Sequence, residues 1–122
     1  MTDEAFERWV HAYGRAWEAR DVLAFTALFT ESAPYHWTPF ETAKAGRAGI
    51  ARAFIDATST QTDIHFQHEI LAFDGRRGIA SWRCRFERGG ALVRLDGILL
   101  AEFDLEAEPP LCRLFREWWH SA

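Results

Sequence analysis

The last ten residues of the chain hold the pattern best suited to chemistry. Glu117 lies between Phe115 and Trp119 at two-residue spacing. Successive side chains of a β-strand point to opposite faces, so in a strand this carboxylate shares its face with two aromatic rings. A carboxylate among rings loses hydration, which raises its pKa and suits it to proton transfer or to ligand binding. The pattern therefore predicts a pocket carboxylate at Glu117.

A structural interpretation of Glu117 is also open. Exposed charges on a sheet often form cross-strand ion pairs, and Arg83 or Arg85 on an earlier segment could serve as the partner. In the opposite register, Arg116 and His120 would line a cavity instead.

Aromatic residues are more abundant than the interior of a small domain requires. The 122 residues are 48% hydrophobic and 15% aromatic, with six Trp and ten Phe. This excess indicates a cavity wall, a partner surface or both. On a predicted strand, one face carries Trp82, Cys84 and Phe86, and the residues between them are polar or charged. We expect Trp82 to contact a ligand.

Charge and hydropathy exclude several classes of partner. The net charge is −4, and the basic residues are scattered, so no patch suited to nucleic acid or to an anionic membrane is expected. The N-terminus has no apolar core of a signal peptide, and no run reaches transmembrane length. We expect a soluble, cytoplasmic protein.

Metal and disulfide sites are not predicted. Cys84 and Cys112 fall on opposite faces of the predicted sheet, so both are expected to be free, buried thiols. His65 and His68 are three residues apart on a predicted strand and face opposite ways, and no other metal-ligand spacing occurs. The sequence implies no cofactor.

The N-terminal half predicts helices. A helix from Thr2 to Trp17 is indicated by apolar residues at three- and four-residue steps, namely Phe6, Trp9, Val10, Tyr13 and Trp17. Asp21 is expected to cap a shorter helix that carries Leu23, Leu28 and Phe29. The segment 35–40 should be extended because Thr38 precedes a proline, and a third helix is expected at about residues 49–57.

The second half predicts an antiparallel meander. Asp74-Gly75 and Gly89-Gly90 predict hairpin turns, and Pro109-Pro110 predicts the end of the strand before it. The strands expected between these turns are residues 63–73, 78–88, 91–105 and 111–120. Helices followed by hairpins predict a single α+β domain over residues 1–122, with the helices on one face of the sheet.

The outer face of the sheet is expected to need a cover. Residues 93–100 are apolar on both faces near their middle, unlike a strand with one face in water. A homodimer through the sheet is the simplest cover. The expected contributors are Ile98, Leu100, Leu114 and Trp118.

Four segments in this order resemble the nuclear transport factor 2-like superfamily. This superfamily includes ketosteroid isomerases, SnoaL-type polyketide cyclases and limonene epoxide hydrolase. The segments are residues 13–21, 33–40 (Ala-Pro-Tyr-His-Trp-Thr-Pro-Phe), 46–50 (Gly-Arg-Ala-Gly-Ile) and 115–119 (Phe-Arg-Glu-Trp-Trp). The resemblance implies a cone-shaped α+β barrel, with three N-terminal helices packed on a strongly curved antiparallel sheet. Because this fold hosts many chemistries, the function stays open.

The resemblance also implies roles for single residues. Tyr13 takes the position of the ketosteroid isomerases' oxyanion donor, but the positions of their two catalytic carboxylates hold Thr38 and Leu99. That mechanism is therefore not expected here. Trp119 matches a pocket Trp, which directs Phe115 and Glu117 inward.

By the two-residue period of a strand, Thr38 would bring His36 inward with it. A core histidine with satisfied hydrogen bonds is favoured over one that transfers protons. The Asp-Arg-Asp relay of limonene epoxide hydrolase is not reproduced, because Asp96 is expected on the outer face.

Two functions are consistent with these patterns. The first is a SnoaL-like enzyme of the isomerase, cyclase or dehydratase type, in which Glu117 moves a proton on a small, apolar, cyclic substrate and Tyr13 stabilises an oxyanion. The second is a non-catalytic module for ligand binding or dimerisation, with a filled cone. The residues expected to line the cavity are Tyr13, Trp17, His36, Thr38, Phe54, Trp82, Phe115, Glu117 and Trp119.

Overall fold

Helix α1 (Asp3–Ala19) is the longest helix and forms one wall of the molecule. Its N-cap is Thr2, whose hydroxyl oxygen accepts a hydrogen bond from the Ala5 backbone N–H at 3.0 Å. The helix ends at Arg20, which takes a left-handed conformation with φ 53°. Its buried side consists of Phe6, Trp9, Val10, Tyr13, Gly14 and Ala16. The predicted helix is confirmed, and it extends two residues further than expected.

Two shorter helices follow. Asp21 caps α2 (Val22–Thr26) by accepting a hydrogen bond from the Ala24 N–H at 3.0 Å, as predicted. This helix ends before Leu28 and Phe29, which were expected inside it. Helix α3 (Gly46–Thr58) begins three residues earlier than predicted and buries Ile50 and Phe54.

The sheet has six strands in the order β2-β1-β6-β5-β4-β3. All neighbouring strands are antiparallel except β1 and β6, which are parallel. The strands are β1 (Pro34–His36), β2 (Lys44–Ala45), β3 (Thr62–Phe73), β4 (Arg77–Arg88), β5 (Ala91–Asp104) and β6 (Leu111–Ser121). The predicted meander is confirmed. Strand β1 lies in the segment predicted to be extended, whereas β2 was not predicted; these two short strands continue the sheet beyond β6.

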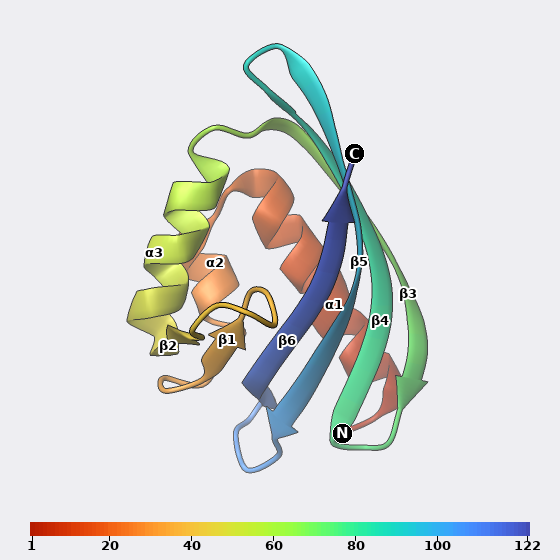
Figure 1. Cartoon of the computed structure of the whole chain (residues 1–122). Coiled ribbons are helices and arrows are strands. Elements are labelled where there is room, and N and C mark those ends of the chain that lie inside the picture. The colour runs from red at the N-terminus through yellow and green to blue at the C-terminus, as the bar shows by residue number, and fades with distance from the viewer.

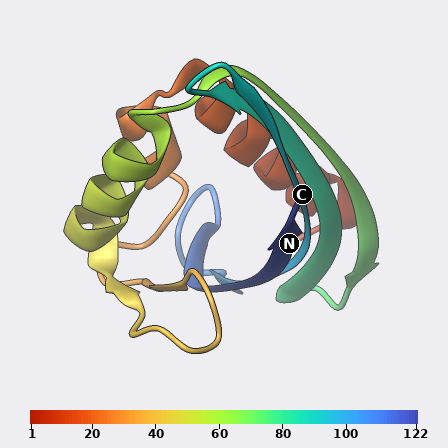
Figure 2. The same ribbon diagram turned by 45° about the horizontal axis from the view of Figure 1, so that its top comes forward.

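The computed structural model describes residues 1–122 as a curled sheet with helices on its inner side (Figure 1). In a second view, α1 lies along β3 and β4, while α3 lies on the opposite side of the molecule from β5 and β6 (Figure 2). The α+β cone expected from the resemblance is therefore the observed architecture. No helix is long and apolar enough to cross a membrane.

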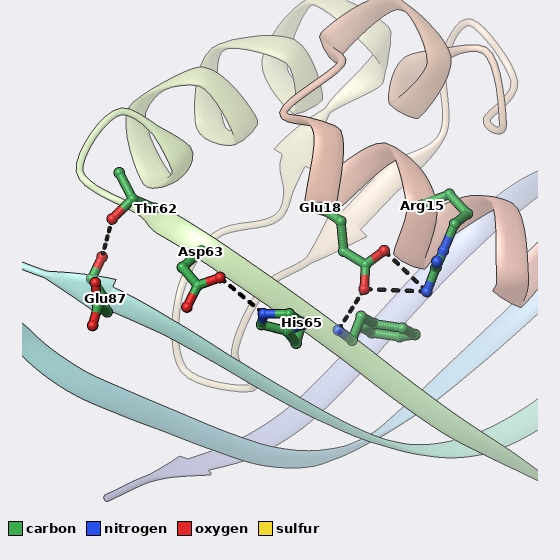
Figure 3. Close-up of polar contacts among 7 residues, drawn as sticks. Arg15, Glu18, Thr62, Asp63, His65 and Glu87 are labelled. Atoms are coloured by element: carbon green, nitrogen blue, oxygen red, sulfur yellow. Dashed lines mark hydrogen bonds and ion pairs between the residues drawn. The ribbon is translucent and has the colours of Figure 1, made fainter.

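Close packing and polar contacts join α1 to β3. A Cβ at Gly14 would lie 2.3 Å from the Phe66 ring, so only glycine permits this approach. Beside this contact, the Glu18 carboxylate accepts a hydrogen bond from the Phe66 backbone N–H at 2.8 Å and pairs with Arg15 at 2.9 Å (Figure 3). Where β3 begins, Asp63 pairs with His65 at 2.9 Å (Figure 3).

Both cysteines are buried and free, as expected. Burial raises the pKa of Cys84 to about 12 and that of Cys112 further still, so neither thiol readily forms a thiolate. On the outer face, Arg83 pairs with Asp96 at 3.4 Å.

Candidate functional site

A cavity of about 590 Å³ opens between the helices and the concave side of the sheet. Fourteen of its 22 lining residues are hydrophobic, which is typical of a site for a small organic molecule. Six of the residues expected there line it, namely Tyr13, Trp17, Phe54, Trp82, Glu117 and Trp119. The open volume contradicts the hypothesis of a filled cone.

Strand β6 presents Glu117 to this cavity. In the antiparallel register of β5 and β6, Glu117 lies opposite Leu99, and only 7% of the surface of Glu117 is exposed. Arg116 and Trp118 lie on the opposite face, in the register expected for this strand. The structural interpretation of Glu117 as an outer-face ion pair is wrong, because Glu117 is buried on the cavity wall. On the outer face, Arg83 pairs with Asp96 instead.

Two tyrosine hydroxyls contact the Glu117 carboxyl group. The Tyr35 hydroxyl donates to Oε1 at 3.2 Å, and the Tyr13 hydroxyl lies 3.5 Å from Oε2. The two hydroxyl oxygens are 2.9 Å apart, and either could be the donor in that contact. Helix α1 and strand β1 thus bring two phenols to one carboxyl group on β6.

Each phenol has a single proton, which limits how many of these bonds form at once. The contact between Tyr13 and Oε2 is at the long limit for a hydrogen bond, whereas its contact with Tyr35 is short. The distances therefore favour a chain in which Tyr13 donates to Tyr35, and Tyr35 donates to Oε1 of Glu117. This chain leaves Oε2 of Glu117 available to hold a proton or to bind a ligand.

Burial dominates the protonation equilibrium of this cluster. It raises the pKa of Glu117 to about 8, although the two tyrosine hydrogen bonds act in the opposite direction. Burial and the nearby Glu117 charge raise the pKa values of Tyr13 and Tyr35 well above the ordinary range. Both phenols consequently stay protonated, and Glu117 is the group that changes charge near neutral pH.

The structure contradicts the predicted inward orientation of His36 and Thr38. His36 and Thr38 were expected to face inward, but they are absent from the cavity wall, which Tyr35 and Trp37 line instead. In the parallel pairing with β6, Tyr35 lies opposite Phe115, and His36 lies opposite the outward Arg116.

Thr38 lies beyond the end of the strand. Strand β1 stops at His36, and with Tyr35 and Trp37 on the cavity wall the two-residue alternation directs Thr38 away from the cavity. The Thr38 hydroxyl donates to the exposed Glu41 side chain at 3.3 Å.

Phe115 also lies elsewhere than expected. It is fully buried and does not line the cavity. Its ring stacks on Tyr35, with centroids 4.5 Å apart, and on Tyr13 at 5.4 Å. Phe115 therefore supports the two phenols from behind, and its predicted contact with a ligand is wrong in this geometry.

The local sequence did not predict Tyr35 as a site residue. Its place beside Glu117 depends on the parallel pairing of β1 with β6, two segments about 80 residues apart. The one available signal was a second tyrosine on a short extended segment.

Three of the four indole groups on the cavity wall differ in hydrogen bonding. Trp17 Nε1 donates to the Gln61 side-chain oxygen at 2.8 Å, and Trp119 Nε1 donates to the Trp37 carbonyl at 3.1 Å. Trp82 Nε1 is buried and has no acceptor in the protein.

Besides Glu117, the ionisable side chains on the cavity wall are Glu41, Lys44, Asp56 and Arg88. Arg88 is engaged, since its Nε donates to Thr60 Oγ1 at 3.1 Å and its guanidinium lies over the Phe86 ring. No group of three or more His, Cys, Asp or Glu side chains is arranged to hold a metal ion.

Residues 10–106 match the model of the SnoaL-like domain family. No curated protein matches the sequence.

Solved structures with the same fold include three of interest. The epoxide hydrolase/cyclase-like enzyme SalBIII, described in pyran ring formation in the polyether salinomycin, is 19% identical with a TM-score of 0.81, covering 98% of this chain and 95% of its own. A candidate scytalone dehydratase from Novosphingobium aromaticivorans is 11% identical with a TM-score of 0.83 (98% and 85% covered). A candidate SnoaL-like polyketide cyclase from Shewanella denitrificans is 10% identical with a TM-score of 0.81 (98% and 92% covered). At these identities the likeness establishes the fold alone.

Proposed function

The chain belongs to the SnoaL-like domain family, and from this premise we propose that it binds a small, neutral, cyclic molecule in the cavity and moves a proton on it with Glu117. The observation that carries the proposal is a buried carboxyl group on the wall of an aromatic cavity, in contact with two phenol hydroxyls and with no cation. Such an arrangement is typical of carboxyl groups that exchange protons near neutral pH.

The chemistry follows from the protonation state of Glu117. With a pKa of about 8, roughly one molecule in ten carries the ionised form at pH 7. In a dehydration, the protonated form can donate its proton to a ligand hydroxyl group that leaves as water, and the carboxylate so formed takes a proton from the adjacent carbon as the C=C bond forms. The ionised form can remove a proton from a carbon next to a carbonyl and return it to the resulting enolate at another carbon. Both steps conserve the proton, and Glu117 returns to its starting state after each cycle.

The two phenols orient this carboxyl group. The resemblance suggested Tyr13 as an oxyanion donor, but in the favoured chain its single proton is donated to Tyr35. We assign Tyr13 and Tyr35 a positioning role, in which they fix one carboxylate oxygen and leave the other for the ligand. The neighbouring proteins named as hydrolase/cyclase-like, dehydratase and polyketide cyclase support chemistry of this kind.

A fragment screen by thermal shift, with the wild type and Glu117→Gln in parallel, tests the proposal. Cyclic ketones, lactones and epoxides that stabilise the wild type are then incubated with each protein in D2O. NMR detects deuterium at carbon and any new product. We expect exchange or turnover with the wild type and a loss of at least a hundredfold with Glu117→Gln.

Two results would contradict catalysis. Equal exchange rates with both proteins would show that Glu117 does not carry the proton. Ligands that bind the wild type with neither exchange nor turnover would favour the non-catalytic binding module.

A further inference from the structure

The buried polar residues of the chain gather at the cavity. Apart from aromatic residues and cysteines, the buried residues with polar side chains are Thr58, Gln61 and Glu117, which are 5%, 4% and 7% exposed, and all three line the cavity. Burial of a polar side chain is costly unless hydrogen bonds compensate for it. The Thr58 hydroxyl is compensated, since it donates to the Phe54 carbonyl at 2.8 Å. Gln61 is compensated only in part, and the proposed function gives it no role.

Three of the four polar groups of Gln61 are bonded within the protein. Its backbone N–H donates to the Thr58 carbonyl at 3.0 Å, and its backbone carbonyl accepts from Arg20 Nη1 at 3.3 Å. Its side-chain Oε1 accepts from Trp17 Nε1 at 2.8 Å. An indole N–H can only donate, so this bond fixes which end of the carboxamide meets Trp17. The Nε2 amino group is the end that remains.

The Nε2 amino group of Gln61 makes no hydrogen bond in the protein, and it keeps accessible surface. Trp82 Nε1 is the one side-chain nitrogen or oxygen that is sealed from solvent without a partner, so the unpartnered Gln61 Nε2 is not sealed. Because Gln61 lines the cavity and only 4% of its surface is exposed, the accessible side of this group is on the cavity. Its N–H bonds are therefore available to a ligand.

Helix α1 separates this donor from Glu117. Tyr13, which contacts Glu117, and Trp17, which contacts Gln61, are one helical turn apart, about 6 Å along the helix axis. Their rings lie edge to face, with centroids 6.3 Å apart. The cavity thus has two polar positions in succession along α1. One is Glu117 beside Tyr13, and the other is Gln61 beside Trp17.

We propose that Gln61 determines specificity, in that its Nε2 donates a hydrogen bond to an acceptor oxygen of the ligand at a distance from the carbon on which Glu117 acts. Ligands with a carbonyl or similar oxygen at this second position are favoured over those with a hydrocarbon there, because a hydrocarbon leaves the buried donor unpaired. This inference rests on the proposed function for the role of Glu117, whereas the hydrogen bond from Gln61 requires only that a ligand enters the cavity.

Two probes that differ by one carbonyl group test the inference. The diketone 4,4′-bicyclohexanone has an acceptor oxygen at each end, whereas the monoketone 4-cyclohexylcyclohexanone has a hydrocarbon at one end. Gln61→Met keeps the length of the side chain but has no N–H, and we expect it to bind the diketone about five- to tenfold more weakly than the wild type does, as the loss of one net hydrogen bond allows. The monoketone, whose one oxygen is served by Glu117 alone, should lose less affinity.

Gln67→Met is the matched control. Gln67 is exposed on β3 and does not line the cavity, so the same substitution there removes a carboxamide without removing the proposed donor. That variant should bind both ketones as the wild type does.

The carboxamide resonances provide a direct readout in the folded wild type. The chain contains two glutamines, Gln61 and Gln67, and no asparagine, so only two side-chain carboxamide pairs occur in its 1H-15N spectrum. The pair that remains in Gln67→Met belongs to Gln61, and this pair should move downfield when the diketone is added to the wild type. The Gln67 pair should not move. These signals do not depend on how well Gln61→Met folds.

The outcomes separate this inference from the proposed function. An unmoved Gln61 pair, equal losses of affinity for the two ketones in Gln61→Met, or failure of the diketone to bind the wild type would each overturn the inference. If Glu117→Gln stops deuterium exchange into the diketone while the Gln61 pair stays unmoved, the inference fails and the proposed function stands. If the Gln61 signals and affinities change as expected but Glu117→Gln exchanges deuterium like the wild type, the inference stands and the proposed function fails.

Discussion

The hydroxyl groups of Tyr13 and Tyr35 contribute unequally to the acidity of Glu117. The resemblance directed attention to Tyr13, yet Tyr35 makes the shorter contact with the carboxyl group, at 3.2 Å compared with 3.5 Å. A hydrogen bond to the ionised form lowers the pKa of an acid. The phenol with the shorter contact should therefore contribute more to the acidity of Glu117.

Substitution of each phenol by phenylalanine tests this ranking. Tyr35→Phe should raise the pKa of Glu117 from about 8 by about one unit, as expected for the loss of one bond to a charged group. Tyr13→Phe should raise it by less. The carboxyl carbon signal of Glu117, followed by 13C NMR through a pH titration, measures both shifts. A larger rise for Tyr13→Phe would mean that the chain of donors runs in the reverse direction.

At the scale of elements, the sequence predicted the helices, caps and turns that depend on local signals. The α1 stripe, the Asp21 cap and the glycine turns at 75 and 89–90 are confirmed because each is determined within a few residues. The orientation predicted for residues 35–38 was inverted because its phase was taken from the match of Thr38 to the isomerase base, whereas Tyr35 and Trp37 line the cavity. Long-range parallel pairing with β6 decides which side Tyr35 faces, and no local pattern contains that information.

Strand β5 carries glycine at position 97, where the Trp82 ring and strand β6 pack closely against its backbone. A Cβ at Gly97 would lie 2.8 Å from the Trp82 ring, 2.9 Å from Trp119 Cβ and 2.6 Å from the Trp118 carbonyl oxygen. Gly97→Ala should therefore cost about 1–3 kcal/mol of unfolding free energy, as overpacking does. It should also shift the indole resonances of both rings. Urea unfolding and 1H-15N spectra measure these effects.

Gly49→Ala is the matched control for that change. Position 49 lies inside α3, and a Cβ there would make an ordinary contact of 3.4 Å with Lys44. Alanine is the better helix former, so this variant should be more stable by up to about 1 kcal/mol. Equal stability changes at the two glycines would contradict the argument from close packing at Gly97.

At the scale of the whole molecule, the class and order of the elements followed from the sequence, whereas the cavity did not. An excess of rings indicated a cavity wall, but similar rings also fill the interior, as Phe115 does behind Tyr13 and Tyr35. Which aromatic residues border open space depends on the curvature of the sheet and on the placement of α3. These properties emerge only from the assembled fold.

The expected homodimer concerns the convex face of the sheet. Ile98 and Trp118 are direct cross-strand neighbours there and are 37% and 39% exposed. We expect light scattering after size exclusion to give the mass of a dimer, and Trp118→Glu to give a monomer, because a charge would be buried at the interface. Leu92→Glu, at an exposed site near the β4–β5 turn, should remain dimeric. A wild type that is monomeric at every concentration would refute the dimer.

The buried carboxyl group also determines how global stability depends on pH. The pKa of Glu117 is about 8 in the folded state and near 4.5 when unfolded. Between these values the folded state binds more protons than the unfolded state, so stability falls as pH rises through this window. The contribution is fully present below about pH 4.5, is lost by about pH 8, and amounts to roughly 3–5 kcal/mol.

Glu117→Gln removes this titration while keeping a side chain of similar shape. Urea unfolding at pH 5, 7 and 9 should show a steeper decline for the wild type than for Glu117→Gln, which becomes the more stable protein at pH 9. Glu87→Gln, an exposed site on β4, should follow the wild type. Parallel curves for the wild type and Glu117→Gln would show that Glu117 does not change charge in this range. That result would also remove the basis for its role in moving protons, because a carboxyl group kept in a cavity at a cost to stability is the pattern expected of a functional site.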